Sequence, residues 1–408
     1  MQIEHSVRLL DRSTPPHILT LTTLAGIGAL SMSIFLPSLG AMSDHFGVDY
    51  GVMQLAVSGY LFATAAIQLI AGPLSDRFGR RPVTMVALLL FIVATLGTLI
   101  APNITVFMIC RLLQAAVATC LAMSRAVVRD LYPPHQAASR LGYVTMGMSI
   151  IPMIGPMVGG ALQEVAGWQS VFVFLLIAGL AATVLTWRDM GETISGKGLT
   201  LREQISGYPE LMRSVRFWGY VACTAFSSGA YYALLGGASF VAGTVFELSP
   251  MWAGIGLGAP ASGYLVGNFL SGRYSVRLGI NRMALIGSMV STVGLGTSLI
   301  VTLLGVSDPL IFFGFCMFLG LGNGMTMPNA TAGSLSVRPQ LAGTASGLGG
   351  AIMIVGGSVM AVIAGAALDP AWREIPLQII MLSSSALSVL ALLVVIRRDR
   401  RLSDDLPR

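Results

Sequence analysis

Charged residues that could form and break ion pairs gather in one short stretch, residues 72–82, which reads GPLSDRFGRRP. An aspartate and three arginines lie there, and an arginine can bind a carboxylate through two parallel hydrogen bonds. Glycine and proline interrupt helices, and charges cannot remain in hydrocarbon, so we expect an ordered turn at a membrane face. The candidate residues of this stretch are Gly72, Asp76, Arg77, Gly79, Arg80 and Arg81.

Arg111 is the most informative charge elsewhere, because it lies about a turn and a half inside an apolar run. A charge at this depth is costly and normally lines a cavity or finds a partner. One interpretation is structural: Arg111 ties helices together through carbonyls and through amides such as Gln114. The other is functional: Arg111 is a cavity cation that binds an anionic group or senses protonation nearby. The residues alone leave both interpretations open.

Methionine, tyrosine and asparagine side chains within apolar runs could line a cavity in the membrane. Methionine-rich surfaces adapt to many ligands, although methionines at helical spacing more often serve packing. Buried asparagines need hydrogen-bond partners, and for them we expect structural bonds. The candidates are Tyr60, Met146, Met148, Met153, Met157, Tyr231, Tyr232, Asn323 and Asn329.

The sequence offers no arrangement suited to metal binding or covalent chemistry. Its four cysteines lie in apolar runs without metal-like spacing, and none of its four histidines forms a pair at ligand spacing. It also has no convincing nucleophile-and-base set and no soluble sensory domain, which disfavours a membrane enzyme or a receptor. We therefore predict no metal, no cofactor and no enzymatic activity.

The elements that must hold these residues are membrane-spanning helices. Apolar residues make up 54% of the 408 residues and charged residues only 10%, against roughly a quarter charged in an ordinary soluble protein. The mean hydropathy is +0.78. A soluble globule with this composition would lack the polar residues to cover its surface, so the chain is predicted to be a polytopic membrane protein.

Twelve apolar runs are each long enough to cross about 30 Å of hydrocarbon as a helix. They lie near residues 18–42, 50–71, 83–101, 105–127, 138–162 and 168–187, and then near 217–243, 251–271, 282–304, 309–330, 341–368 and 375–396. This pattern predicts an all-α membrane protein with two six-helix bundles. The bundles are residues 1–187 and 217–408, and a cytoplasmic linker, residues 188–216, tethers them.

A repeated turn indicates that the two bundles are related. Residues 72–82 have a diverged copy at residues 272–281, at an offset of 200 in a chain of 408. The recurring residues are Gly72, Ser75, Arg77 and Gly79, which return as Gly272, Ser275, Arg277 and Gly279. We therefore expect the two bundles to be pseudo-symmetric.

The basic residues report the topology. If both chain termini lie on the same side of the membrane, all but three of the 24 Lys and Arg residues fall on that side. The exceptions are Arg111, Arg125 and Arg373. By the positive-inside rule that side is the cytoplasm, so both termini are predicted to be cytoplasmic. The net charge of +6 is spread over short loops and tails, which argues against a nucleic-acid partner.

Residues 72–82 resemble the G-x-L-a-D-R-x-G-R-R motif of the major facilitator superfamily, in its loop between the second and third transmembrane helices. Other stretches resemble one branch of it, the drug:proton antiporters of the Bcr/CflA type, and together they run across nearly the whole chain. They are RLLQAAVATCLAMSRAVVRD at 111–130, GPMVGG at 155–160, PNA at 328–330 and AGTASGLGG at 342–350.

The resemblance implies a conformational latch at the inner membrane face. It places Asp76 against a helix end of the second half, in the eleventh span, and pairs Arg80 with Asp130. A carboxylate is favoured near a helix N-terminus by the helix dipole. Such contacts would hold the inside closed and would break when the halves rock.

The resemblance also assigns a sealing role to the GPMVGG stretch. Gly155, Pro156, Gly159 and Gly160 would form a gasket between the halves, whereas plain helix packing is the alternative. The first span departs from the family pattern, because Ser33 occupies a position where relatives usually carry an aspartate. No carboxylate lies in mid-membrane, so proton coupling is implied by the family alone.

The resemblance implies an exporter of small amphipathic molecules or drugs in the bacterial inner membrane. It would work by alternating access around a central cavity, with proton entry as the driving reaction. We expect a monomer whose partners are a small-molecule substrate, protons and the lipid bilayer. The alternative is uptake or facilitated diffusion of a small organic anion bound through Arg111.

Overall fold

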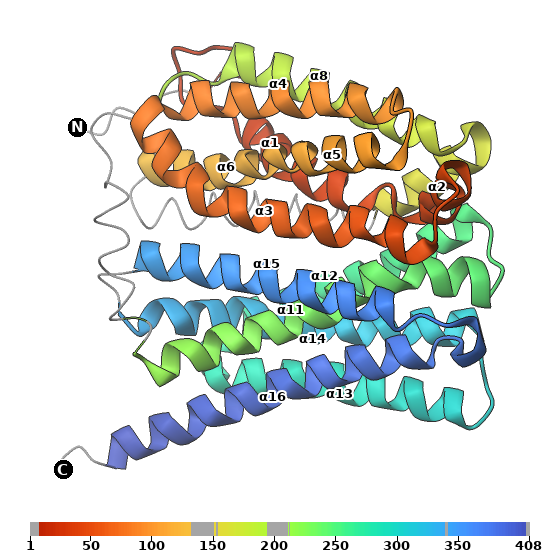
Figure 1. Cartoon of the computed structure of the whole chain (residues 1–408). Coiled ribbons are helices and arrows are strands. Elements are labelled where there is room, and N and C mark those ends of the chain that lie inside the picture. The colour runs from red at the N-terminus through yellow and green to blue at the C-terminus, as the bar shows by residue number, and fades with distance from the viewer. Residues whose placement is uncertain are drawn as a thin grey trace.

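The computed structural model describes residues 8–131, 151, 154–193, 211, 213–338 and 342–404, and every regular element in these ranges is helical. The upper lobe in Figure 1 contains α1 (Ile18–Ser33), α2 (Leu39–Phe46), α3 (Tyr50–Phe78), α4 (Arg80–Leu99), α5 (Ile104–Gln114), α6 (Ala118–Leu131) and α8 (Trp168–Asp189). The lower lobe contains α11 (Val215–Phe240), α12 (Pro250–Leu278), α13 (Ile280–Leu303), α14 (Pro309–Ser336), α15 (Ala342–Ala366) and α16 (Ile375–Asp404). Residues 154–166 form a further helix.

The repeat seen in the sequence returns in the helix boundaries. α3 and α12 each have 29 residues and begin 200 positions apart, at Tyr50 and Pro250. Each ends at a glycine of positive φ, 95° at Gly79 and 83° at Gly279, before α4 and α13 begin. Glycine adopts this conformation easily because it has no Cβ. One residue type at one position therefore fixes the same sharp turn in both lobes.

Side-chain caps fix the beginnings of two helices at the opposite end of the bundle. Before α5, the Asn103 side chain accepts a hydrogen bond from the Val106 amide at 3.0 Å. Before α14, Asp308 accepts from the amides of Leu310 and Ile311 at 2.8 and 3.2 Å. The first amides of a helix lack partners within the helix, so these caps set where each span starts.

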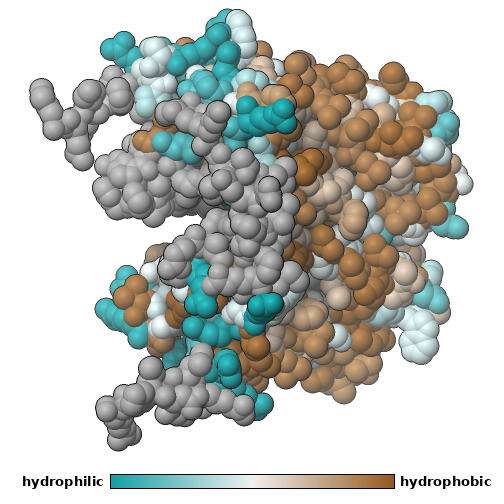
Figure 2. Space-filling view, turned by 60° about the vertical axis from the view of Figure 1, so that its left-hand side comes forward, coloured by the Kyte–Doolittle hydropathy of each residue, from teal (hydrophilic) through white to brown (hydrophobic). Residues whose placement is uncertain are grey.

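Nine helices of the described residues are long and apolar enough to cross a membrane. α11 and α12 are as long, with 26 and 29 residues, but their glycines, serines and tyrosines make them less apolar. Figure 2 shows a broad hydrophobic zone on this face, with hydrophilic residues gathered toward its edges. The prediction of a multi-pass, all-helical membrane protein is confirmed.

Two carboxylates connect the helix ends at the side of the repeated turns. Asp189, at the end of α8, accepts hydrogen bonds from the His17 amide at 2.8 Å and the Thr20 hydroxyl at 2.6 Å, beside the start of α1. Asp399, near the end of α16, forms an ion pair with Arg216 at 2.6 Å, beside the start of α11. The same arrangement of last helix and first helix thus appears in each lobe.

Candidate functional site

A glycine contact joins helix 154–166 to α12 of the other lobe. A Cβ on Gly160 would lie 2.1 Å from the Pro250 carbonyl oxygen, and a Cβ on Gly254 would lie 2.2 Å from the carbonyl oxygen of Pro156. These distances leave no room for a side chain, so the two backbones touch. Near the same end, Glu164 accepts a hydrogen bond from the Ser249 hydroxyl at 3.1 Å.

The other two glycines of the GPMVGG stretch face α1 of their own lobe. A Cβ on Gly159 would lie 1.7 Å from the Ile34 carbonyl oxygen, and one on Gly155 would lie 2.8 Å from the Ser33 hydroxyl. Ser33 itself is buried and donates a hydrogen bond to the Ala29 carbonyl at 3.0 Å. The stretch therefore packs in two directions, and only part of it contacts the opposite lobe.

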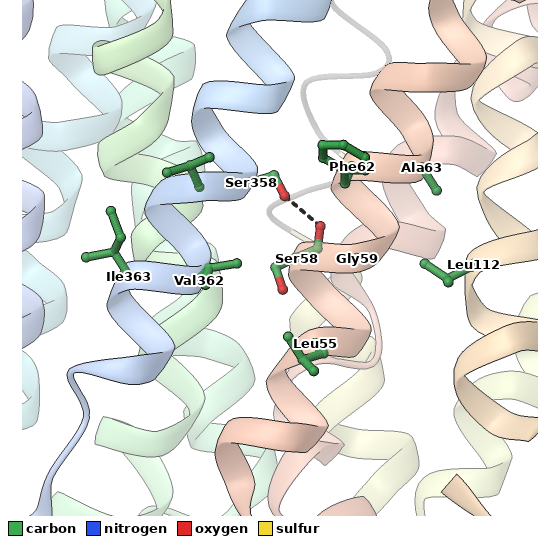
Figure 3. Close-up of a pocket in the computed structure, with 10 residues that line it drawn as sticks. Leu55, Ser58, Gly59, Phe62, Ala63, Leu112, Ser358, Val362 and Ile363 are labelled. Carbon is green, nitrogen blue, oxygen red and sulfur yellow. Dashed lines mark hydrogen bonds between the residues drawn. The ribbon is translucent and has the colours of Figure 1, made fainter. Parts of the chain in front are cut away.

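A second contact between the lobes runs along α3 and α15, which lie side by side in Figure 1. The Ser358 hydroxyl donates to the Ser58 carbonyl at 2.7 Å, as Figure 3 shows. The Gln54 amide donates to the Ala361 carbonyl at 2.8 Å. Both bonds join a side chain to a backbone oxygen, so they can break without leaving an unpaired charge.

A groove of about 490 Å³ lies along this same seam. Phe62, one of its lining residues, is 60% exposed, which indicates that the groove faces the lipid. An apolar lining of this kind suits lipid chains, and it offers few polar groups to orient a substrate. The apolar residues around it include Leu55, Phe62, Leu112, Val362 and Ile363 (Figure 3). Val359 also lines the groove.

Arg111 is fully buried among residues of its own lobe. Its guanidinium donates to the Ser31 carbonyl and to the Gln114 side-chain oxygen, both at 2.7 Å. The same group lies 4.1 Å from the ring centroids of Phe35 and Tyr60, one on each side. A planar guanidinium between two rings gains cation–π attraction as well as hydrogen bonds. Of the two interpretations the sequence left open, these contacts favour the structural one.

Arg80 forms the ion pairs near the repeated turn in the first lobe. It forms ion pairs with Asp76 at 2.6 Å and with Asp130 at 2.9 Å, and its side chain is 4% exposed. The pair with Asp130 is the one the resemblance implies. Asp76 shares this cation with Asp130, and residues 339–341, just before α15, lie outside the described part of the chain. The latch role of Asp76 stays a prediction.

The remaining residues of this turn have separate surroundings. Arg77 lies over the ring of Phe78, 5.2 Å from its centroid. Arg81 donates to the Trp187 carbonyl at 3.3 Å. A Cβ on Gly72 would meet no atom within 4 Å, so a larger residue would fit at this position without a steric clash.

Glu192 was not singled out in the sequence, and it contacts the turn directly. Its side-chain oxygens accept from the amides of Arg80 at 2.9 Å and Arg81 at 3.3 Å. Glu192 thereby caps the start of α4 and favours it through the helix dipole. Glu192 lies 112 positions from Arg80 in sequence, so no local motif could predict this contact.

The two asparagines of α14 are satisfied within their own lobe. Asn323 accepts a hydrogen bond from the Ser227 hydroxyl at 2.5 Å. Asn329 donates to the Ser271 hydroxyl and to the Met325 carbonyl, both at 2.8 Å. These bonds agree with the structural use expected for them.

Arg125 of α6 is one of the three basic residues that depart from the predicted charge asymmetry, and it was not a candidate site residue. Its side chain is exposed to solvent, although surrounding protein partly desolvates it. A depth estimate along the helix would have been needed to single it out.

The structure therefore brings together only part of the predicted cavity set. Tyr231 and Tyr232 are half-buried, and their ring centroids lie 5.9 Å apart, whereas Tyr60 is buried against Arg111. Met157 is 45% exposed. The predicted residues Met146, Met148 and Met153 lie outside the described residues.

Comparison with known proteins identifies the family to which this chain is similar. The profile of the Major Facilitator Superfamily matches residues 21–361. "Uncharacterized MFS-type transporter YdgK" of Bacillus subtilis is 27% identical over 353 residues, 84% of this chain and 86% of that protein. "Multidrug resistance protein D" of Escherichia coli is 27% identical over 354 residues, 84% of this chain and 87% of that protein.

A solved structure shares the fold at low identity. A bacterial homologue of the human lysosomal transporter Spinster superposes with a TM-score of 0.70 at 17% identity, covering 94% of this chain and 96% of that one. Since the family profile spans well over half of the residues, the chain belongs to the Major Facilitator Superfamily, whose members are membrane transporters and not enzymes.

Proposed function

We propose that this chain exports small amphipathic molecules or drugs across the bacterial inner membrane by alternating access. The observation that carries the proposal is the interface between the lobes. It includes backbone contacts at Gly160 and Gly254, hydrogen bonds from Gln54 and Ser358, and the hydrogen bond from Ser249 to Glu164. No ion pair crosses it among the described residues. Such an interface can open while each lobe keeps its own core.

The proposed topology has twelve spans in two six-helix bundles, residues 1–187 and 217–408, with both termini in the cytoplasm. Residues 188–216 would link the bundles on that side. The arginines beside the repeated turns support this orientation, because Arg77, Arg81, Arg277 and Arg282 all lie at one end of the bundle. We take the transporter to act as a monomer.

Drug-like cargo is supported by the relatives. The Escherichia coli relative carries the name of a multidrug resistance protein and aligns over most of both chains. The rocking of the lobes would use Gly155, Pro156, Gly159 and Gly160 as the outer seal and the Arg80 cluster as the inner latch. Coupling to proton entry is proposed from the drug:proton antiporter resemblance.

Export can be tested in a drug-sensitive bacterial host without its main efflux pumps. Cells that produce the chain should accumulate less ethidium and less chloramphenicol than cells with the empty vector. Adding a protonophore should restore accumulation in energised cells. Equal accumulation of every compound in a broad panel by producing cells and empty-vector cells would refute export. Export that continues after the protonophore is added would refute proton coupling.

The alternative, uptake of an organic anion bound through Arg111, has less support. The guanidinium is fully buried, and protein oxygens accept its hydrogen bonds. An anion could reach it only after this packing opened.

A further inference from the structure

Glu164 lies on the face of helix 154–166 that contacts the other lobe. It follows Gly160 by four positions, and residues four apart share one face of a helix. A Cβ on Gly160 would lie 2.1 Å from the Pro250 carbonyl oxygen and 3.0 Å from the Met251 Cα. Since α12 begins at Pro250 and reaches its turn only at Gly279, this contact lies at the end of the bundle away from the repeated turns.

The Glu164 carboxylate caps the start of α12 from outside its lobe. One of its oxygens accepts hydrogen bonds from the Ser249 hydroxyl at 3.1 Å and from the Met251 amide at 3.3 Å. Ser249 is the N-cap residue of α12, but its own side chain makes no capping hydrogen bond. Pro250 has no amide hydrogen, so Met251 carries the first amide that needs a partner. The first lobe therefore supplies the cap that α12 lacks.

Other helices that begin at this end are capped within their own lobe. Asn103 accepts from the second amide of its own helix, α5, and Asp308 does the same for α14. Such caps are unaffected when the lobes move apart. The cap of α12 forms only while helix 154–166 lies against it, and a carboxylate at a helix N-terminus is also favoured by the helix dipole. Capping of α12 is thus linked to the closure of this end.

The Glu164 contact can break and form again at small cost. Glu164 is exposed, so water can replace its hydrogen bonds when the lobes separate. In the described part of the chain no ion pair joins Glu164 to a cation, so separation leaves no opposite charge unpaired. The neighbouring glycines let the backbones approach but form no directional bond. Glu164 adds that bond at the same place.

We propose that Glu164, Ser249 and the Met251 amide form an outer latch, which favours the closed state of this end and releases when the lobes rock open. This inference rests on the proposed alternating access and adds to the glycine seal a polar contact that a substitution can weaken without a steric clash. Glu164 is a positioning residue: it acts on the relative position of the lobes and not on the substrate.

Distances between spin labels test the outer latch in the purified full chain in detergent. Ile100, after α4, and Leu304, after α13, are 80% and 78% exposed at this end, one in each lobe. With labels at these positions in a cysteine-free background, double electron–electron resonance reports the populations of closed and open states. We expect Glu164→Ala to raise the ratio of open to closed molecules about 3- to 10-fold, as for a lost charged helix cap.

Graded variants separate the hydrogen bonds from a general change in structure. Glu164→Gln should shift the ratio less than Glu164→Ala, because its amide oxygen still accepts hydrogen bonds but carries no full charge. Ser249→Ala removes one of the two donors and should also give a smaller shift. Added to Glu164→Ala, it should have little further effect, because the partner is already absent. Asp44→Ala, which removes another exposed carboxylate at this end, is the matched control and should leave the ratio unchanged.

An unchanged ratio in Glu164→Ala, an equal shift in Asp44→Ala, or full additivity of the Glu164 and Ser249 substitutions would overturn the outer latch. A chain that exports drugs from cells but whose distances ignore Glu164→Ala refutes the latch alone. A chain whose distances respond as expected but which exports nothing refutes the proposed function and leaves the latch standing.

Discussion

Gly160 and Pro250 meet backbone to backbone across the two lobes. A Cβ on the glycine would lie 2.1 Å from the proline carbonyl oxygen, closer than non-bonded carbon and oxygen atoms can approach. The adjacent Gly159 instead faces Ile34 of its own lobe. Successive residues of a helix point about 100° apart, so one short stretch both anchors to its own lobe and closes against the other.

Replacing Gly160 with alanine should therefore hold the lobes apart at this end. We expect Gly160→Ala to lower export strongly while the amount of membrane-inserted protein stays normal, because the added methyl collides with the other lobe only when the lobes close. Drug accumulation and immunoblotting measure the two quantities. Gly314→Ala is the matched control, since a Cβ there meets no atom within 4 Å. Equal effects of both substitutions would contradict the seal.

Loss of the Ser358–Ser58 hydrogen bond should shift the equilibrium between closed and separated lobes by a smaller amount. Losing one neutral hydrogen bond costs about 0.5–1.5 kcal/mol, so Ser358→Ala should favour separated lobes by roughly two- to ten-fold. Spin labels at the exposed Val52 and Trp252, in a cysteine-free background, would report the distance between the lobes. Ser262→Ala, which removes a bond within α12 alone, should leave the distance distribution unchanged. An unchanged distribution in Ser358→Ala would show that the bond does not hold this seam.

The Arg80 cluster predicts a transport defect without a folding defect. Asp76→Asn removes one of the two carboxylates around Arg80 and should abolish transport while expression stays normal. Asp76→Glu keeps the charge and should restore part of the activity. Unaffected transport in Asp76→Asn would remove the latch, whatever the role of Asp130.

Substitutions of the two arginines of the fourth span should differ in their effect on protein stability. Arg111→Ala leaves buried oxygens without their donor and should cost about 3–5 kcal/mol, as when one partner of a buried charged network is removed. Arg125→Ala removes an exposed side chain without partners among the described residues, so it should leave the melting temperature nearly unchanged. Thermal unfolding of the purified proteins in detergent compares them. A comparable destabilisation by Arg125→Ala would show that Arg125 is structural.

Local patterns in the sequence determined the helical class and the repeat. Hydropathy adds up along a window, so the spans themselves could be predicted. The predicted ends near residues 71 and 271 are wrong, because α3 and α12 continue to Phe78 and Leu278 and turn only at the positive-φ residues Gly79 and Gly279. The charges of residues 72–82 could likewise be placed at a membrane face. The Arg80–Asp130 pair, 50 residues apart, followed from the family resemblance and not from spacing.

Only the tertiary structure decided which side chains face which lobe. Arg111 and Arg125 have the same chemistry on one span, but Arg111 is buried against Phe35 and Tyr60, whereas Arg125 is exposed, because neighbouring helices cover one position and not the other. Gly159 and Gly160 are neighbours in sequence but contact different lobes for the same reason. Composition and spacing act along one chain, whereas burial and pairing depend on residues that come from distant helices.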